Sequence, residues 1–241
     1  MTCRDEDGLP MIMPVFTISP YPFTFLASFV LSFLIVFALL RHQGIPANLI
    51  GYSMFLNIVM TLCGAKMYSV FTSGFKQNIL NSGISSLGGV IGLFAGTILF
   101  GYIYREGRKE FLKTYTLVVP LMYSIAKIGC YLMGCCHGIP YDGPLCVSYQ
   151  NDLIQGGPYF PVQLSETVVF LLIFLICLGI YRSKHTDYVV PAVMILCAIG
   201  KFSLEYLREE HIGKILSANQ WVCIGFVLWG LSLIYKNKRK A

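Results

Sequence analysis

Charged residues are scarce in this sequence: Asp, Glu, Lys and Arg make up only 12% of its 241 residues, about half the share usual in soluble proteins. Apolar residues make up 56%, and the mean hydropathy is +0.66. This composition excludes an ordinary soluble domain and is typical of a polytopic membrane protein. No RNA- or DNA-binding pattern is present, so the net charge of +6 favours anionic lipid over nucleic acid as a partner.

Long apolar windows recur along the whole chain. A helix needs about 17–25 mostly apolar residues to cross a bilayer. Seven such windows can be drawn, at residues 23–40, 49–71, 85–104, 115–133, 162–181, 189–207 and 218–235. They predict an all-α protein with seven transmembrane helices, formed by residues 1–241 as a single transmembrane domain.

The connections between these windows predict the orientation. Most of their basic residues fall on one side: Arg41, Arg105, Arg108, Lys109, Lys113, Arg182, Lys184, Lys236, Lys238, Arg239 and Lys240. This bias places the C-terminus in the cytoplasm and the N-terminus outside. Residues 1–20 are acidic and lack the cationic segment of a signal peptide, so we expect a retained N-terminal extension.

Three lysines lie inside the predicted spans, where charge is otherwise rare. They are Lys66, Lys127 and Lys201, each beside Gly, Ala or Cys. A charge near the bilayer centre costs roughly 2.5–3.5 kcal/mol, and such residues usually mark a functional site. Small neighbours let helices approach closely and leave room for a ligand. The lysines therefore predict an anion site, with lipid phosphate as the expected ligand.

Further polar residues share helical spacing with these lysines. Lys201, Glu205 and Arg208 are spaced i, i+4 and i+7, which predicts one helix face, although Lys201 and Glu205 could simply neutralise each other. Lys127 and Cys130 are spaced in the same way with Gly134. The glycine-rich stretch at residues 83–92 suits close helix packing or a backbone contact to an anion.

The connection at residues 134–161 contains no Lys or Arg and is predicted to face outward as a Cys-rich loop. Its thiols, Cys135, Cys136 and Cys146, lie near Cys130 and His137. Four interpretations stay open: a disulfide from Cys135 or Cys136 to Cys146, inert packing, a thiol activated by His137, and a metal site. No metal is expected, because no second ligand pair follows at zinc-finger spacing.

Several short motifs occur in a recognisable order. They are Gly-Ile-Ser-x-x-Gly-Gly-x-x-Gly from residue 83, Lys-Ile-Gly-x-Tyr-x-x-Gly from residue 127, Pro-x-Gln-x-x-Glu from residue 161, Lys-Phe-x-x-Glu-Tyr-x-Arg from residue 201, and Asn219-Gln220. In this order the chain resembles the prolipoprotein diacylglyceryl transferases over about residues 45–235. Those bacterial inner-membrane enzymes move diacylglycerol from phosphatidylglycerol to a lipobox cysteine, and use no cofactor.

The resemblance implies site residues. Lys127 falls on the family's essential arginine, and Lys201 and Lys66 fall on two further arginines. Residues that match the family pattern as they stand are Gly88, Gly89, Gly134, Gly138, Gln163, Glu166, Glu205, Arg208 and Gln220. We expect Lys127, Lys201, Glu205 and His137 in catalytic roles. We expect substrate binding from Lys66, Gly88, Gly89, Gly134, Gly138, Gln163, Glu166 and Arg208.

The sequence also departs from the family. Leu87 stands where the family has an important His, Ser165 replaces a Tyr, and Cys130 and Cys135 replace an Asn and a Glu. Lysine offers a point charge where arginine clamps a phosphate bidentately. We therefore expect an atypical transferase in which His137 could take over proton transfer. A lipid or anion transporter and a thiol-redox protein using Cys135 and Cys136 remain alternatives.

Overall fold

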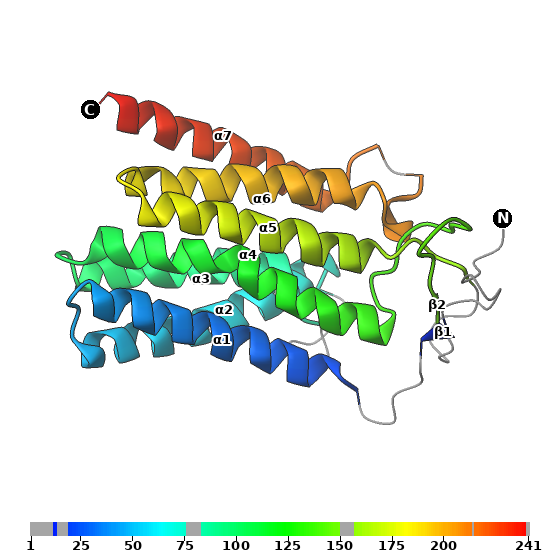
Figure 1. Ribbon diagram of the computed structural model, residues 1–241, viewed down its shortest axis with the longest axis horizontal. Coiled ribbons are helices and arrows are strands. Elements are labelled where there is room, and N and C mark those ends of the chain that lie inside the picture. The colour runs from blue at the N-terminus through cyan, green and yellow to red at the C-terminus, as the bar shows by residue number, and fades with distance from the viewer. Residues whose placement is uncertain (1–11, 14–18, 76–82, 150–156, 214, 240–241) are drawn as a thin grey trace. The chain divides into compact units, whose positions relative to one another are not determined.

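The computed structural model describes residues 12–13, 19–75, 83–149, 157–213 and 215–239, and over this part the chain is helical (Figure 1). The long helices are α1 (Tyr21–His42), α2 (Ala47–Thr72), α3 (Ser86–Ile103), α4 (Arg108–Met133), α5 (Val162–Arg182), α6 (Val189–Glu205) and α7 (Ala218–Lys238). All seven are long and apolar enough to span a membrane. The predicted fold class is confirmed; the orientation of the termini stays a prediction.

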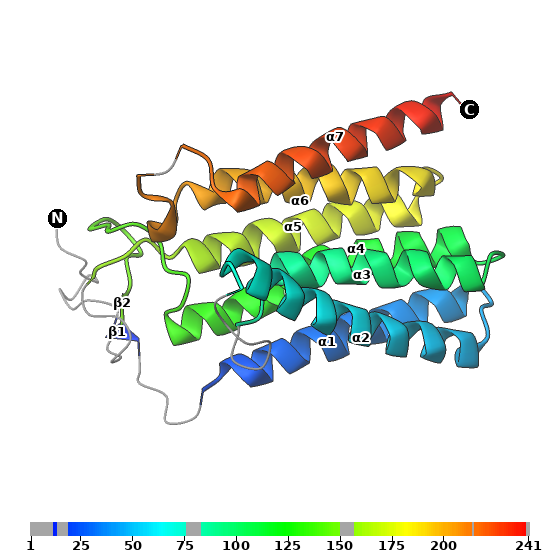
Figure 2. The same cartoon turned by 180° about the vertical axis from the view of Figure 1, so that it is seen from behind.

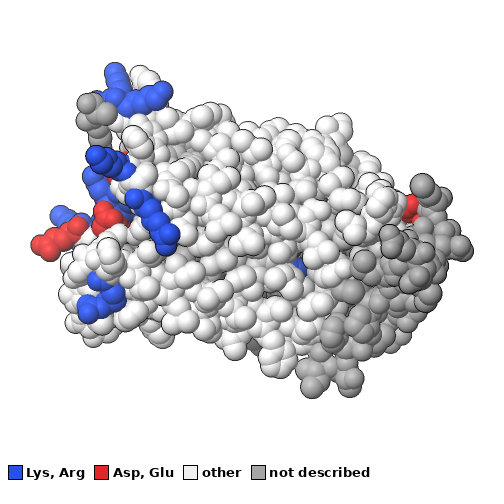
Figure 3. All heavy atoms as spheres, viewed as in Figure 1, with Lys and Arg blue, Asp and Glu red and all other residues white. Residues whose placement is uncertain are grey.

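The helix surfaces are apolar as well as the interior. Large side chains such as Phe55, Ile103 and Trp221 are more than half exposed. On the face shown in Figure 3, the sides of the helices carry almost no charge. Exposed apolar area of this extent is unfavourable in water and is typical of a lipid-facing surface.

The described chain divides into two compact units. Unit 1 lies within residues 1–29, 120–176 and 194–241, and unit 2 within residues 30–119 and 177–193. The boundaries fall inside α1, α4, α5 and α6 rather than in linkers. The predicted single domain stays a prediction.

In unit 2 the glycine-rich start of α3 packs on α2, and the two helices lie side by side (Figure 2). The Ser85 hydroxyl caps α3 by accepting from the Gly88 N–H. A Cβ on Gly88 would overlap the carbonyl oxygen of Gly64, and one on Gly92 would overlap the carbonyl oxygen of Met60. These glycines therefore allow backbone-to-backbone packing, one of the two interpretations open from the sequence.

We expect Gly92→Ala to destabilise the protein by at least about 1–3 kcal/mol, because the added methyl meets backbone that cannot move aside. Gly51→Ala is the matched control: Gly51 lies on α2 with no atom within 4 Å of the added methyl, so Ala should be neutral or stabilise by up to about 1 kcal/mol. Thermal unfolding in detergent measures both. Equal melting temperatures for the two variants would contradict the packing interpretation.

Helix α4 begins at Arg108, seven residues before the predicted start of the fourth span, so that boundary was wrong. The added part lies in unit 2 and contains Lys113, which is almost buried. Its Nζ lies 2.8 Å from Asp187 Oδ1 and donates to Thr186 Oγ1 at 3.2 Å. An ion pair with η1 (Thr186–Tyr188) thus stabilises the first part of α4, which hydropathy alone would leave outside the fourth span.

In unit 1 short backbone pairings organise the segment after α4. Strand β2 (Ser148–Tyr149) pairs in parallel with β1 (Ile12–Met13), with Ile12 opposite Ser148. Isolated bridges join Gly138 to Arg208 and Tyr159 to both Pro140 and Val147. The described part of the connection at 134–161 is therefore ordered by backbone pairing. Within unit 1 it lies near the start of α7 and away from the C-terminus (Figure 1).

Candidate active site

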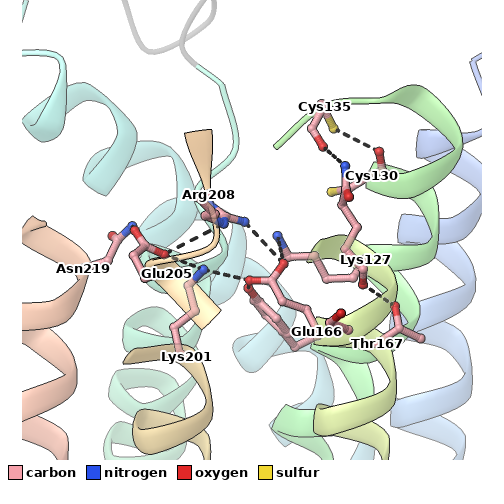
Figure 4. Close-up of polar contacts among 12 residues, drawn as sticks. Lys127, Cys130, Cys135, Glu166, Thr167, Lys201, Glu205, Arg208 and Asn219 are labelled. Atoms are coloured by element: carbon pink, nitrogen blue, oxygen red, sulfur yellow. Dashed lines mark hydrogen bonds and ion pairs between the residues drawn. The ribbon is translucent and has the colours of Figure 1, made fainter. Parts of the chain in front are cut away.

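Glu166 is the centre of a buried charge cluster in unit 1 (Figure 4). It lies in the second turn of α5 and is fully buried. Lys127 Nζ on α4 lies 2.8 Å from Glu166 Oε2, and Lys201 Nζ on α6 lies 2.9 Å from Oε1. Arg208 Nη2 lies 3.4 Å from Oε2. One carboxylate thus meets three cations from three segments.

Glu205, at the end of α6, is the second carboxylate of this cluster. Its Oε2 lies 2.8 Å from Lys201 Nζ and 3.9 Å from Arg208 Nε. Its Oε1 accepts from Ser217 Oγ at 3.1 Å and from Asn219 Nδ2 at 2.8 Å. Ser217 also forms a capping box with Gln220 at the start of α7. Glu205 therefore connects the lysine on α6 to the first turn of α7.

The charges of this cluster do not cancel. Lys127, Lys201 and Arg208 contribute three positive charges, and Glu166 and Glu205 contribute two negative ones. All except Lys201 are buried, and the Lys201 side chain is only 15% exposed. An uncompensated charge is costly where water is excluded. The arrangement therefore favours binding of an anion.

Arg208 reaches the cluster differently from what its spacing predicts. Helix α6 ends at Glu205, and Arg208 has an extended backbone (φ −92°, ψ 140°) before η2 (Glu209–His211). The prediction that Lys201, Glu205 and Arg208 share one helix face was wrong for Arg208. Its backbone pairs with Gly138 instead of continuing the helix, and its guanidinium still contacts Glu166. Burial alone would lower the pKa of Arg208, but the neighbouring negative groups, Glu166 first among them, favour the charged form and raise this pKa above its usual value.

The sequence did not single out Tyr123. Its hydroxyl donates to Glu166 Oε1 at 2.8 Å, and its ring lies 5.1 Å from Lys127 Nζ and 5.9 Å from Lys201 Nζ. A spacing of four residues from Lys127 on α4 was the available signal. Beside it, Ser124 Oγ donates to the Thr167 carbonyl at 2.8 Å, which holds α4 to α5 at this level.

One glutamine and two glycines of the predicted site shape the loop next to the cluster. Gln163 is fully buried and donates from Nε2 to the Cys135 carbonyl at 3.0 Å. Gly134 follows the end of α4 at φ +72°, a conformation that favours glycine. The Gly138 N–H donates to the Phe160 carbonyl at 3.2 Å, and a Cβ there would overlap that oxygen.

Not every predicted site residue belongs to unit 1. Lys66 on α2 and Gly88 and Gly89 on α3 belong to unit 2. Their role at a lipid head group stays a prediction. In unit 1, His137 Nε2 contacts the Glu209 carboxylate and Nδ1 lies 3.2 Å from the Gly134 carbonyl oxygen. Its ring nitrogens are thus next to oxygens rather than a thiol, and its catalytic role also stays a prediction.

The cysteines of the loop follow none of the predicted pairings. Cys146 is disulfide-bonded, whereas Cys135 and Cys136 are free. The predicted disulfide from Cys135 or Cys136 to Cys146 was therefore wrong, and Cys146 does not join a thiol site. Instead, Cys135 and Cys136 turn back toward Cys130, and the sulfurs of all three lie within 4.8 Å of one another. The other thiols and the charges of Lys127 and Arg208 lower the pKa of Cys136.

Comparison with known proteins agrees with the order of the motifs. The family of prolipoprotein diacylglyceryl transferases matches residues 10–236. A phosphatidylglycerol–prolipoprotein diacylglyceryl transferase 2 of Clostridium perfringens is 28% identical over 172 residues, which is 66% of this chain and 64% of the relative. The corresponding proteins of Tolumonas auensis and Chloroherpeton thalassium are each 25% identical and match 89% and 93% of this chain, or 89% and 90% of their own lengths.

The match to the Clostridium perfringens relative thus spans a little under two thirds of that protein, while the other two are matched over most of their length. The matched range includes every residue of the charge cluster around Glu166. The resemblance that the motifs predicted is confirmed, and the chain belongs to the prolipoprotein diacylglyceryl transferase family.

Proposed function

We propose that this protein transfers a diacylglyceryl group from phosphatidylglycerol to the cysteine thiol of a lipobox-containing precursor, at the outer face of the bacterial inner membrane. The observation that carries the proposal is the excess positive charge of the buried cluster around Glu166. A phosphodiester head group supplies the missing negative charge. The names of the family's relatives support the same donor and acceptor.

The reaction is a displacement at a glycerol carbon. The acceptor sulfur forms a new C–S bond as the C–O bond to phosphate breaks, and glycerol phosphate leaves with the electron pair. The proton of the thiol passes to solvent or to the leaving phosphate. Negative charge therefore develops on phosphate oxygen, and preorganised cations at that position lower the barrier.

The cations of unit 1 are the groups that would perform this stabilisation. Lys127 and Lys201 each offer an ammonium with more than one donor, so they can keep a carboxylate partner and still donate to phosphate. Glu166 and Glu205 hold them in place, with Tyr123 fixing one oxygen of Glu166. Lys66, Gly88 and Gly89 are proposed as further head-group contacts, and the loop at 134–161 as the acceptor side.

Reconstitution tests the proposal directly. The full chain in phosphatidylglycerol liposomes should convert a synthetic lipobox peptide to its diacylglyceryl thioether, seen as the corresponding mass increase. The same peptide with Ser in place of Cys should remain unchanged. Movement of labelled lipid between leaflets without any peptide adduct would instead support the transporter alternative and remove the transferase proposal.

A further inference from the structure

Three thiols meet where α4 ends, next to the charge cluster around Glu166. Cys130 lies in the last turn of α4 and is only 8% exposed. Cys135 is exposed and Cys136 is partly buried. The three sulfurs lie within 4.8 Å of one another. The set is thus buried at Cys130 and exposed at Cys135, and Figure 4 shows these two residues next to each other.

The backbone takes up an unfavourable conformation to bring these thiols together. After Gly134, Cys136 also has a positive φ, of +58°. This left-handed conformation costs a residue with a Cβ roughly 1–2 kcal/mol. It reverses the chain within one turn, so that Cys136 comes back to Cys130. Such cost is usually tolerated where the resulting arrangement has a use.

Sulfur spacing in this cluster suits a thiophilic metal ion. Tetrahedral coordination with Zn–S bonds of about 2.3 Å separates the sulfurs by about 3.8 Å, so a closure of about 1 Å or less would complete the site. Thiolates select Zn²⁺ over harder divalent ions. Lys127 and Arg208 lie close enough for their positive charges to act on Cys136.

Within the described part of the chain, this cluster has three ligands and no fourth. Among the described residues, no further His, Cys, Asp or Glu side chain joins the three sulfurs. His137 is engaged with Glu209, and Cys146 is disulfide-bonded. Structural zinc sites use four protein ligands, whereas sites that act on a substrate use three and leave one position open.

We propose that Cys130, Cys135 and Cys136 bind Zn²⁺, and that the fourth position takes the thiol of the acceptor. The first claim, that the three cysteines bind Zn²⁺, is the metal half of the proposal and stands on the thiol geometry alone. The second claim, that the acceptor thiol takes the fourth position, is the acceptor half and rests on the proposed function. On binding, the three cysteines and the acceptor thiol lose their protons to solvent, and no redox change occurs. The metal would thereby deliver a thiolate at neutral pH beside the lysines that bind the lipid phosphate.

Cobalt substitution tests the metal half. Co²⁺ added to the full chain in detergent with a phosphine reductant should produce a sulfur-to-cobalt charge-transfer band and tetrahedral d–d bands, and Zn²⁺ should displace it. Loss of an outer-shell group already weakens metal binding about 10–100-fold. Each of Cys130→Ser, Cys135→Ser and Cys136→Ser should therefore weaken Zn²⁺ binding by more than about 100-fold.

Cys63→Ser is the matched control, because Cys63 is a free, exposed thiol on α2 in unit 2. It should bind Co²⁺ as the wild type does. No charge-transfer band in the reduced wild type, or an equal band in the triple Ser variant, would overturn the proposal.

A measurement on the wild type covers the case in which the Ser variants fail to fold. Zn²⁺ should slow alkylation of Cys130, Cys135 and Cys136 together while leaving Cys63 unchanged, and a chelator should restore the rates. Mass-spectrometric mapping resolves each site. Unchanged alkylation of the three thiols with saturating Zn²⁺ would show that they do not bind it.

N-acetylcysteine amide tests the acceptor half, with N-acetylserine amide as its control. Only the thiol should raise the charge-transfer intensity of the Co²⁺ form, since a fourth thiolate is added. An unchanged spectrum would show that the fourth position does not take a thiol. These spectra need no turnover, so they can succeed if the transferase proposal fails. Conversely, full transfer by the triple Ser variant would overturn only the acceptor half.

Discussion

Glu166→Gln is expected to lower the free energy of unfolding by about 3–5 kcal/mol, which is the usual cost of removing one partner from a buried ion pair. Glu166 neutralises parts of three cations at once. Without its charge, Lys127, Lys201 and Arg208 would face Glu205 alone, and the excess positive charge in the cluster would double. Denaturation in mixed detergent micelles measures the loss.

Glu210→Gln serves as the control, because Glu210 is an exposed carboxylate close to the same segment. It should change stability by no more than about 0.5 kcal/mol. Adding Lys127→Met to Glu166→Gln removes one of the stranded cations and should recover part of the loss, because charges in contact do not act additively. Wild-type stability in Glu166→Gln would contradict the prediction, because it would show that the three cations do not depend on the Glu166 charge.

Lys201→Met is expected to leave the fold intact and to reduce transfer by about 10²–10³-fold, the effect of removing one preorganised stabiliser of developing negative charge. Glu166→Gln is expected to destabilise the fold and Lys201→Met is not, because the two substitutions change the net charge of the cluster in opposite directions. Removing one cation leaves two cations against two carboxylates, a balanced cluster that no longer attracts phosphate. The initial rate of peptide modification and binding of labelled phosphatidylglycerol in detergent should fall together.

Two further variants sharpen this test. Lys184→Met removes an exposed lysine beyond the end of α5 and should retain wild-type activity. Lys201→Arg keeps the charge and offers a bidentate fork, so it should keep head-group binding if the site accommodates the larger group. Full lipid binding and turnover in Lys201→Met would remove Lys201 from the phosphate site.

Hydropathy sufficed for the seven helices because each apolar window is long enough to decide the assignment alone. It failed at the start of α4, since Lys113 is stabilised by Asp187, a residue far away in sequence. Helical spacing predicted that Lys201 and Glu205 meet. It could not predict the end of α6, because the pairing of Arg208 with Gly138 depends on a distant loop.

The charge cluster was only partly visible in the sequence. Charge inside apolar windows singled out Lys127 and Lys201, and the motif Pro-x-Gln-x-x-Glu singled out Glu166. Tyr123 escaped notice because a tyrosine in a span is usually ordinary packing. The meeting of Cys130 with Cys135 and Cys136 depends on a left-handed residue at 136, which no pattern in the sequence marks.

The first turn of α7 limits where a lipid can enter unit 1. Ser217 and Asn219 both donate to Glu205, and Gln220 donates to the Phe202 carbonyl of α6 at 3.2 Å. Separating α6 from α7 at this end would break all three hydrogen bonds, at roughly 1.5–3 kcal/mol for each one made to a carboxylate. These hydrogen bonds therefore hold α6 and α7 together at this end. We expect a two-chained lipid to reach the lysines by a route that does not pass between α6 and α7.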